Sequence, residues 1–323
     1  MTTASSSFTG QTAAAAAEPD LARPTRKVPG GAGRRSAWYR RLTPYLFLLV
    51  PVGLLLLLTY TPVVNMFWYS VTDWDGLDKT KNFIGLDNYV EVFTDPDNLR
   101  VFYVSLFYVV GSFVQMALAL YFATILSFKV RFKNMWKGIL FFPYLINGVA
   151  IGLIFLNFLK PGGGLDTVLM KTGLESLVHQ WTGDPDIANF SLAAVSVWRY
   201  TGLTFVMFLG AIQSINSEIY EAAALDGASG WQRFRLVTLP LLLPTVVTAA
   251  VLRSVDLLRL FDIIYLTTQG GPGTASTTLN ILAYRRGFEF SDLGYASAIM
   301  VTLSSLVLGS VLVFARLRRA VAW

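Results

Sequence analysis

The chain has 323 residues, of which 54% are hydrophobic and 14% are charged, and its formal net charge is +6 at pH 7. Because soluble domains carry about 25% charged residues, this composition indicates a membrane protein rather than a soluble one. The sequence contains no cysteine, which excludes disulfide bonds and thiol chemistry.

Residues 1–36 are rich in Ala, Ser, Thr, Gly and Pro and show no periodic apolar pattern. A segment of this composition cannot bury enough apolar surface to fold, so we expect a disordered cytoplasmic tail. The apolar run that follows is too long for the core of a secretory signal, and it lacks a small-residue cleavage site at its end. It predicts an uncleaved membrane anchor at the start of a membrane domain that spans residues 37–323.

Six apolar runs follow along the chain, and each is at least as long as the ~20 residues that cross the hydrocarbon core of a bilayer. They lie at roughly 42–66, 100–127, 138–159, 187–213, 240–262 and 292–315. Gly and Pro interrupt several runs, which membrane helices tolerate when neighbouring groups satisfy the freed carbonyls. Because the runs lack the alternating pattern of membrane β-barrels, the sequence predicts an all-α membrane protein with six transmembrane helices.

Lys and Arg residues are distributed unevenly over the predicted loops. One set of loops, which includes both termini and the segment between the fourth and fifth runs, carries 16 of them, whereas the opposite set carries seven and most of the acids. Cytoplasmic loops of membrane proteins are enriched in Lys and Arg. We therefore expect both termini and the loop at 214–238 to be cytoplasmic, and the net charge reflects this asymmetry rather than nucleic-acid binding.

Polar residues fall near mid-depth in the second, third and fourth predicted helices. Gln115 and Asn147 are expected to form hydrogen bonds between helices. Arg199 is a charge at mid-membrane, which is costly and normally functional. Its neighbours Trp198 and Tyr200 offer flat faces of the kind on which sugars stack, although aromatic residues at such positions also face lipid or the membrane interface.

The loop at 214–238 contains a run of small residues that is followed by a glycine and a proline. Ala222 and Ala223 let another surface approach a short helix, and Gly227 supplies a left-handed or tight turn. Pro240 is expected to open the fifth helix, where its missing N–H costs little. The residues singled out in this region are Glu221, Ala222, Ala223, Asp226, Gly227 and Pro240.

The fifth predicted helix carries four charged residues spaced three apart: Arg253, Asp256, Arg259 and Asp262. Residues at this spacing are neighbours on one helix face. They form either a self-neutralising ladder that packs against another subunit or a polar wall of a translocation path. Counting about 1.5 Å per residue, Arg253 lies at nearly the same depth as Arg199, and Asp256 is expected within reach of Arg199.

Motifs for nucleotide binding and catalysis are missing from the sequence. There is no phosphate-binding G-x-x-x-x-G-K-[ST] loop, so the chain is not expected to bind a nucleotide phosphate itself. The single histidine, His179, lies in a predicted external loop without clustered carboxylates, so neither a metal site nor a Ser-His-Asp triad is expected. We therefore expect no enzyme activity and no cofactor in this chain; if energy is consumed, a partner consumes it.

Several segments resemble the permease subunits of bacterial ATP-driven importers that use a binding protein. The segment Glu221–Gly227, followed by Val237-Thr-Leu-Pro240, resembles their cytoplasmic coupling loop, with Val237 where Ile is commoner. The residue before the coupling helix is often Pro in the family and is Asn216 here, which can act as a helix N-cap. Further segments resemble sugar permeases of the maltose-importer type. They are Phe83–Tyr89, Phe261–Tyr265 with Thr268–Pro272, and Phe288–Ala298.

The resemblance covers about residues 40–318 and points to the first of two permeases in such systems, the MalF-like partner. It implies a type I ABC importer permease fold in a bacterial inner membrane. It also implies a second, MalG-like permease, two ATPase subunits that bind ATP and Mg, and an external solute-binding protein. On that basis Glu221 to Gly227 would dock in a cleft of one ATPase, and the cargo would be a mono- to oligosaccharide. Family members usually carry small or apolar residues at the positions of Arg253 and Asp256.

Other functions fit parts of the sequence. The cargo of such an importer could be another small polar solute, such as a polyol or glycerol phosphate. A self-sufficient secondary transporter would be expected to show inverted repeats and an ion site within one chain, and the sequence shows no internal repeat. A non-transporting scaffold would have no use for charges at mid-membrane.

Overall fold

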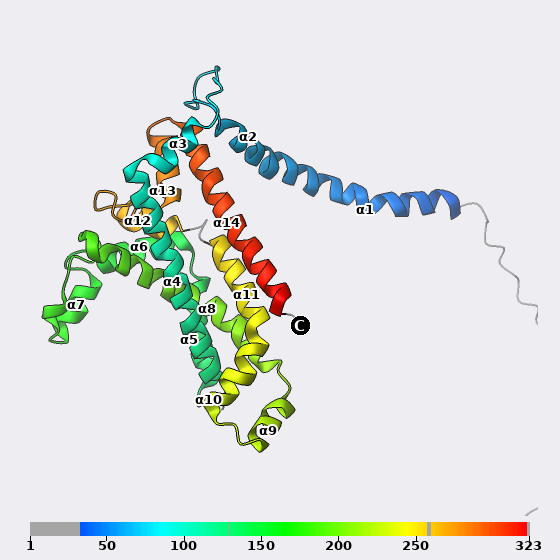
Figure 1. Ribbon diagram of the computed structural model, residues 1–323, viewed down its shortest axis with the longest axis vertical. Helices are drawn as coiled ribbons and strands as arrows, with labels where there is room; N and C mark the ends of the chain where they lie inside the picture. The colour runs from blue at the N-terminus through cyan, green and yellow to red at the C-terminus, as the bar shows by residue number, and fades with distance from the viewer. Residues whose placement is uncertain (1–32, 129, 257–259, 322–323) are drawn as a thin grey trace, which may run out of the picture. The chain divides into compact units, whose positions relative to one another are not determined.

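The computed structural model describes residues 33–128, 130–256 and 260–321, which are mostly helical and contain no strand (Figure 1). The chain divides into two compact units, residues 1–59 and 60–323, and each is described by itself. The first unit holds α1 (Gly33–Leu55) and most of a π-helical segment (Leu56–Tyr60). Every residue from 43 to 59 is exposed, as expected for an apolar helix that lipid or another chain covers. The predicted tail, residues 1–36, lies outside the described residues except for its last four.

The second unit is built around four long helices. They are α4 (Pro96–Ser127), α8 (Pro185–Gln213), α11 (Leu239–Asp256) and α14 (Leu293–Val321). Helix α4 packs along α8, and α14 packs along both α11 and α2 (Thr61–Tyr69). The side chains of Phe205, Phe208 and Leu242 are at most 1% exposed in the core between these helices. This core holds the inward faces of α4, α8 and α11 together.

Helices α4 and α8 begin with the same local sequence, Asp followed by Pro. Asp95 and Asp184 accept hydrogen bonds from the backbone N–H groups two residues ahead, at 2.8 and 2.9 Å. Pro96 and Pro185 then occupy the first helical position, where no intrahelical N–H bond is lost. Both helices therefore start a few residues before the apolar runs from which they were predicted.

The third predicted span, 138–159, is not one helix. It consists of α5 (Lys133–Leu145) and α6 (Gly148–Leu159), which are bent by 97° relative to each other. Asn147 makes the break inexpensive, because its side chain accepts the backbone N–H of Val149 at 2.8 Å and caps α6. Five helices in the described part of the chain are long and apolar enough to cross a membrane, and this bent pair raises the number of candidate spans to six.

The fifth span also differs from its prediction of 240–262. A helix runs without interruption from Gly230 to Asp256 through α10 (Gly230–Arg233), a π-helical turn (Phe234–Thr238) and α11. Pro240 therefore does not open this helix. It lies just after the π-helical turn, whose wider spacing accommodates a residue that cannot donate a backbone hydrogen bond. The start is set instead by Ser229 and Gln232, which form a reciprocal capping box.

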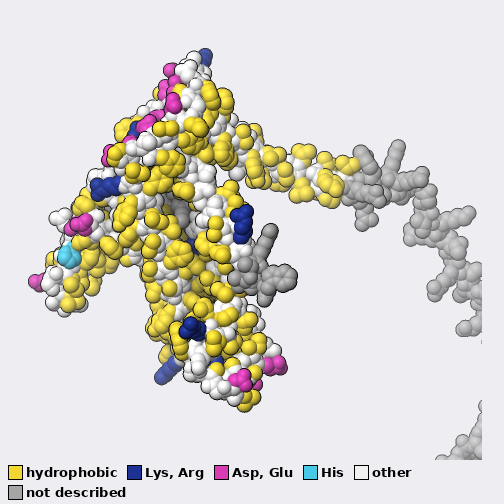
Figure 2. Space-filling view, in the orientation of Figure 1, with side chains coloured by type: hydrophobic (Ala, Val, Ile, Leu, Met, Phe, Trp, Pro, Cys, Tyr) yellow, Lys and Arg dark blue, Asp and Glu magenta, His cyan; other side chains and the backbone are white. Residues whose placement is uncertain are grey.

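Short elements cover the two ends of the bundle. We call the end with α3 (Asp87–Thr94) and α13 (Leu279–Tyr284) the outer end (Figure 1). This end and the loops that lead to it also carry α7 (Gly164–Lys171), a 3-10 turn (Glu175–Leu177), α12 (Asp262–Thr268) and a π-helical turn (Arg285–Glu289). The inner end carries α9 (Ser217–Leu225) and α10. Figure 2 shows acidic side chains at both ends of the visible face and a largely apolar surface between them. This distribution is that of a multi-pass membrane protein.

Candidate functional site

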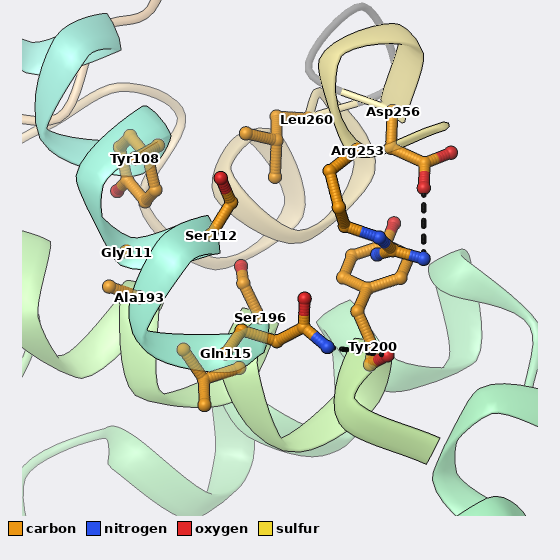
Figure 3. Close-up of a pocket in the computed structure, with 11 residues that line it drawn as sticks. Tyr108, Gly111, Ser112, Gln115, Ala193, Ser196, Tyr200, Arg253, Asp256 and Leu260 are labelled. Atoms are coloured by element: carbon orange, nitrogen blue, oxygen red, sulfur yellow. Dashed lines mark hydrogen bonds and ion pairs between the residues drawn. The ribbon is translucent and has the colours of Figure 1, made fainter. Parts of the chain in front are cut away.

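Two arginines on different helices meet around one tyrosine ring. The guanidinium of Arg253, on α11, lies 5.1 Å from the ring centre of Tyr200, on α8, and that of Arg199 lies 5.0 Å from the same ring. Arg253 is only 5% exposed, and its Nη2 is 3.2 Å from Oδ2 of Asp256 (Figure 3). Cation–π contacts of this kind strengthen as water is removed. We call Arg199, Tyr200, Arg253 and Asp256 the central charged cluster.

The arginines of the cluster retain unused hydrogen-bonding capacity. Among the described residues, the Nε atoms of Arg199 and Arg253 are buried and have no hydrogen-bond partner. A buried donor without a partner costs roughly 1–3 kcal/mol. Such groups indicate a place where water or a polar ligand completes the set of hydrogen bonds.

Arg199 lies beside the break in the third span. A Cβ atom added to Gly148, the first residue of α6, would come within 2.8 Å of Nη1 of Arg199 and would also overlap a carboxylate oxygen of Asp262. Gly148 therefore lets α6 approach both charged side chains. The N-terminal end of α6, Arg199 on α8 and Asp262 on α12 consequently meet at one point.

The predicted ladder of charges is only partly correct. Arg253 and Asp256 form the expected ion pair, but residues 260–261 form a turn and Asp262 begins a separate helix, so Asp262 does not share one helix face with Arg253 and Asp256. Between the described side chains, Asp256 pairs with Arg253 and no ion pair joins it to Arg199. Arg259 lies outside the described residues.

The other residues predicted for the path lie around the cluster. Gln115, on α4, donates from Nε2 to the backbone carbonyl of Tyr200 at 3.1 Å, which confirms the predicted bond between helices. Asn147 instead uses its side chain within its own segment, as the cap of α6. Trp198 is 44% exposed and packs edge-on against Phe155, at 5.4 Å between ring centres, rather than against the guanidinium groups.

A small cavity opens onto the cluster. Its volume is about 40 Å³, and its lining includes Gly111, Ser112, Gln115, Ser196, Tyr200 and Arg253 (Figure 3). This volume holds water but is far below the roughly 300–1,000 Å³ of pockets for small molecules. A mainly apolar cavity of about 630 Å³ between α4, α11 and α14 shares Ser112 and Arg253 with it. Ser112 and Ser196 were missed from the sequence, although Ser112 precedes Gln115 by three residues and so shares its helix face.

The segment predicted to couple to an ATPase forms a short, capped and exposed helix at the inner end. Asn216 accepts the backbone N–H of Glu218 at 3.1 Å, so its predicted capping role is confirmed. Gly227 has φ +77°, which confirms the predicted left-handed turn. Helix α9 buries none of its residues, and Leu225 at its end is 90% exposed. Glu221, Ala222 and Asp226 are exposed and Ala223 is half-buried, so this surface is accessible to a partner.

One hydrogen bond connects α9 to the fifth span. The hydroxyl of Tyr220 lies 3.1 Å from Oγ1 of Thr238, at the end of the π-helical turn. Thr238 is buried, whereas Tyr220 is half-buried. Neither residue was predicted from the sequence. A signal was present, because Tyr220 directly precedes Glu221 and carries a polar group long enough to reach beyond its own helix.

Comparisons with known proteins agree with this geometry. A family model described as "Binding-protein-dependent transport system inner membrane component" matches residues 102–322. The trehalose/maltose transport system permease protein MalF of Thermococcus litoralis is 33% identical, with 85% of this chain and 93% of that protein covered. The sn-glycerol-3-phosphate transport system permease protein UgpA of Yersinia pestis is 32% identical, with 82% and 90% covered.

A solved structure shares the fold. It is the crystal structure of a bacterial ABC transporter involved in the import of the acidic polysaccharide alginate, which matches with a TM-score of 0.72 at 24% identity. The match covers 89% of this chain and 99% of the other chain. The chain described above therefore has an ABC importer permease fold.

Proposed function

Because the chain belongs to the family of binding-protein-dependent transport system inner membrane components, we propose that it is the transmembrane permease subunit of an ATP-driven carbohydrate importer. In this role it passes a mono- to oligosaccharide from an external binding protein across a bacterial inner membrane. A second permease completes the path, and two ATPase subunits bind ATP and Mg. This chain itself performs no chemical step.

The observation that carries the proposal is the course of one helix. The helix Gly230–Asp256 begins beside α9, to which it is bonded through Thr238, and ends at the ion pair of the central charged cluster. From Thr238 to Arg253 it extends by about 22 Å at 1.5 Å per residue. A single rigid element thus reaches from the exposed coupling segment to the buried polar site.

The geometry supports a mechanical sequence. When the ATPase subunits close on ATP, α9 moves with them, because an exposed short helix with small side chains fits into a cleft. The hydrogen bond between Tyr220 and Thr238 passes this movement to the fifth span. Arg253 then shifts against Tyr200, and the small cavity widens until polar groups of the cargo reach the unpaired guanidinium nitrogens.

A carbohydrate suits this site because its hydroxyl groups can accept hydrogen bonds from arginine while its ring stacks on Tyr200. The relatives named for trehalose, maltose and multiple sugars support the same choice. A second candidate is an anionic polyol such as glycerol phosphate. The guanidinium groups of the buried Arg253 and the half-buried Arg199 favour it, because arginine binds phosphate strongly, and matched relatives include UgpA proteins named for this solute.

Uptake by the reconstituted importer tests the proposal. Proteoliposomes with this chain, its partner subunits and the binding protein would receive labelled maltose, trehalose or sn-glycerol 3-phosphate, with and without ATP inside. We expect ATP-dependent accumulation of at least one sugar, and none when this chain is omitted. Accumulation of glycerol phosphate alone would select the second candidate. ATP-independent uptake, or uptake of none of the three, would contradict the proposal.

A further inference from the structure

Four aromatic rings form a connected series on the outer side of the central charged cluster. The rings of Phe261 and Tyr265 are stacked, with 4.7 Å between their centres and 15° between their planes. Tyr284 lies 5.3 Å from the first and 5.1 Å from the second, and Phe288 lies 5.4 Å from Tyr284. We call these four residues the outer aromatic cluster.

Helical spacing explains how the series forms. Phe261 and Tyr265 are four residues apart at the start of α12, and Tyr284 and Phe288 are four apart where α13 passes into the π-helical turn. Residues four apart lie on the same helix face. Two aromatic pairs from separate segments therefore meet: the rings of Phe261, Tyr265 and Tyr284 all contact one another, and Phe288 extends the cluster from Tyr284.

The series is open to the outside. None of the four side chains is buried, and Phe288 is 72% exposed. A cavity of about 380 Å³ lies beside three of the rings, those of Phe261, Tyr284 and Phe288, and the polar residues Asn280 and Ser297 also line it. This volume is within the range of roughly 300–1,000 Å³ that small-molecule sites occupy.

Charged, planar groups border the rings. Arg285, next to Tyr284, donates from Nη2 to the backbone carbonyl of Gln269 at 2.7 Å, and its Nε lies 3.8 Å from Glu289. A pyranose has an apolar face of C–H groups and an edge of hydroxyl groups. The face packs on aromatic rings, and the hydroxyls bond to planar polar side chains such as these.

The series also leads to the site already described. Phe261 directly precedes Asp262, which lies beside Arg199 and Gly148. Leu260, one residue earlier, lines the small cavity together with Tyr200 and Arg253. The rings thus extend from an exposed end at Phe288 to the edge of the central charged cluster.

We propose that the outer aromatic cluster is a pyranose-binding subsite that receives the sugar before it reaches the central charged cluster. This inference rests on the proposed function, because it takes the cargo to be a carbohydrate. The subsite recognises the C–H face shared by pyranoses rather than one pattern of hydroxyl groups. It therefore binds different pyranoses weakly, and the selection among sugars occurs at sites other than this subsite.

Saturation-transfer NMR on the importer purified with its partner subunits tests this subsite. Maltose and trehalose serve as probes, and magnetisation is transferred from aromatic protons of the protein to ring protons of the sugar. We expect transfer in the unmodified importer and a decrease of at least threefold in Phe288→Leu and in Tyr284→Leu. Phe288→Leu is the safer variant, because its exposed side chain contributes little to folding. Tyr284→Phe keeps the ring and should keep the signal.

A matched control removes an aromatic ring that also lies at the outer end but does not belong to the outer aromatic cluster. Phe93 stacks on Phe102 at 5.6 Å and is 53% exposed, so Phe93→Leu should leave the signal unchanged. Absence of transfer to either disaccharide in the unmodified importer, or equal transfer in Phe288→Leu, would overturn the subsite. Since ATP-dependent uptake is measured separately, a failure of the subsite with intact sugar uptake leaves the proposed function standing. Loss of sugar uptake with an intact NMR signal refutes the transport role instead.

Discussion

The hydroxyl of Tyr220 lies 3.1 Å from Oγ1 of Thr238 and links the exposed helix α9 to a buried residue near the start of the fifth span. Thr238 also donates toward the backbone carbonyl of Arg233 at 3.4 Å, across the π-helical turn. π-helical turns are rare and often lie at functional sites. The contact therefore joins the exposed helix α9 to the π-helical turn near the start of the fifth span.

Tyr220→Phe removes this hydrogen bond and keeps the ring. A typical hydrogen bond contributes about 0.5–1.5 kcal/mol, so we expect normal insertion and a two- to tenfold lower ratio of sugar transported to ATP hydrolysed. The ratio is measured in proteoliposomes. Tyr121→Phe, on an exposed side chain of α4, is the control and should leave the ratio unchanged. An unchanged ratio in Tyr220→Phe would show that coupling takes another route.

Gly227→Val tests the turn that ends α9. The new Cβ would meet no atom within 4 Å, so the only cost is the left-handed backbone at φ +77°. A β-branched residue in that conformation costs on the order of 1–3 kcal/mol, and we expect weaker copurification of the ATPase with normal membrane insertion. Gly230→Val is matched to it, because that glycine also has open space and has no left-handed φ. An equal loss of ATPase copurification in both variants would show that the added side-chain volume, and not the backbone conformation of residue 227, causes the effect.

Asp256→Asn tests the ion pair of the central charged cluster. The substitution keeps the volume but leaves the buried charge of Arg253 without its carboxylate. We expect somewhat less assembled importer, because a buried charge that loses its partner is destabilising. Uptake should fall at least tenfold even relative to the assembled amount, because Arg253 loses the carboxylate that orients it beside Tyr200. Assembly is quantified alongside by copurification of the subunits. Asp186→Asn, at an exposed acid, provides the control; wild-type uptake in Asp256→Asn would reduce the pair to a packing role.

Gly148→Ala tests the contact between the broken third span and its charged neighbours. A methyl group there would lie too close to Arg199 and Asp262, and overpacking typically costs about 1–3 kcal/mol. We expect reduced thermal stability of the purified importer together with lower uptake. Gly138→Ala, in α5, has no atom within 4 Å of the new Cβ and should be neutral or slightly stabilising. Identical melting temperatures for the two variants would exclude this contact as a constraint.

The sequence predicted those features that depend on local chemistry. The long apolar runs predicted the membrane spans. Asn216 was correctly predicted to cap α9, and Gly227 was correctly predicted to end it in a left-handed turn. Gln115 was correctly expected to bond between helices, because a buried amide at mid-membrane has few other partners.

Features that depend on contacts between distant segments could not be predicted in the same way. The run 138–159 is long and apolar enough on average to predict one span, and its polar Asn147 was assigned to a bond between helices. The sequence could not show that Arg199 and Asp262 from other helices meet the chain at this break. Spacing by three residues suggested one ladder, but it cannot reveal that a turn at residues 260–261 separates Asp262 from α11. The position of Pro240 within a longer helix depends on the π-helical turn before it, which has no simple sequence pattern.

The central claim is that movement of α9 reaches the buried polar site through the fifth span. Because the chain has no cysteine, Ser196→Cys would place its only thiol in the lining of the 40 Å³ cavity, where residue 196 is 9% exposed. The measurement is the rate at which this thiol reacts with a small water-soluble reagent, in an importer whose partners lack cysteine. We predict that ATP, binding protein and sugar together raise the rate at least tenfold, and that Tyr220→Phe removes most of the increase. A rate that does not respond to ATP, or a full response in the Tyr220→Phe background, would contradict the claim.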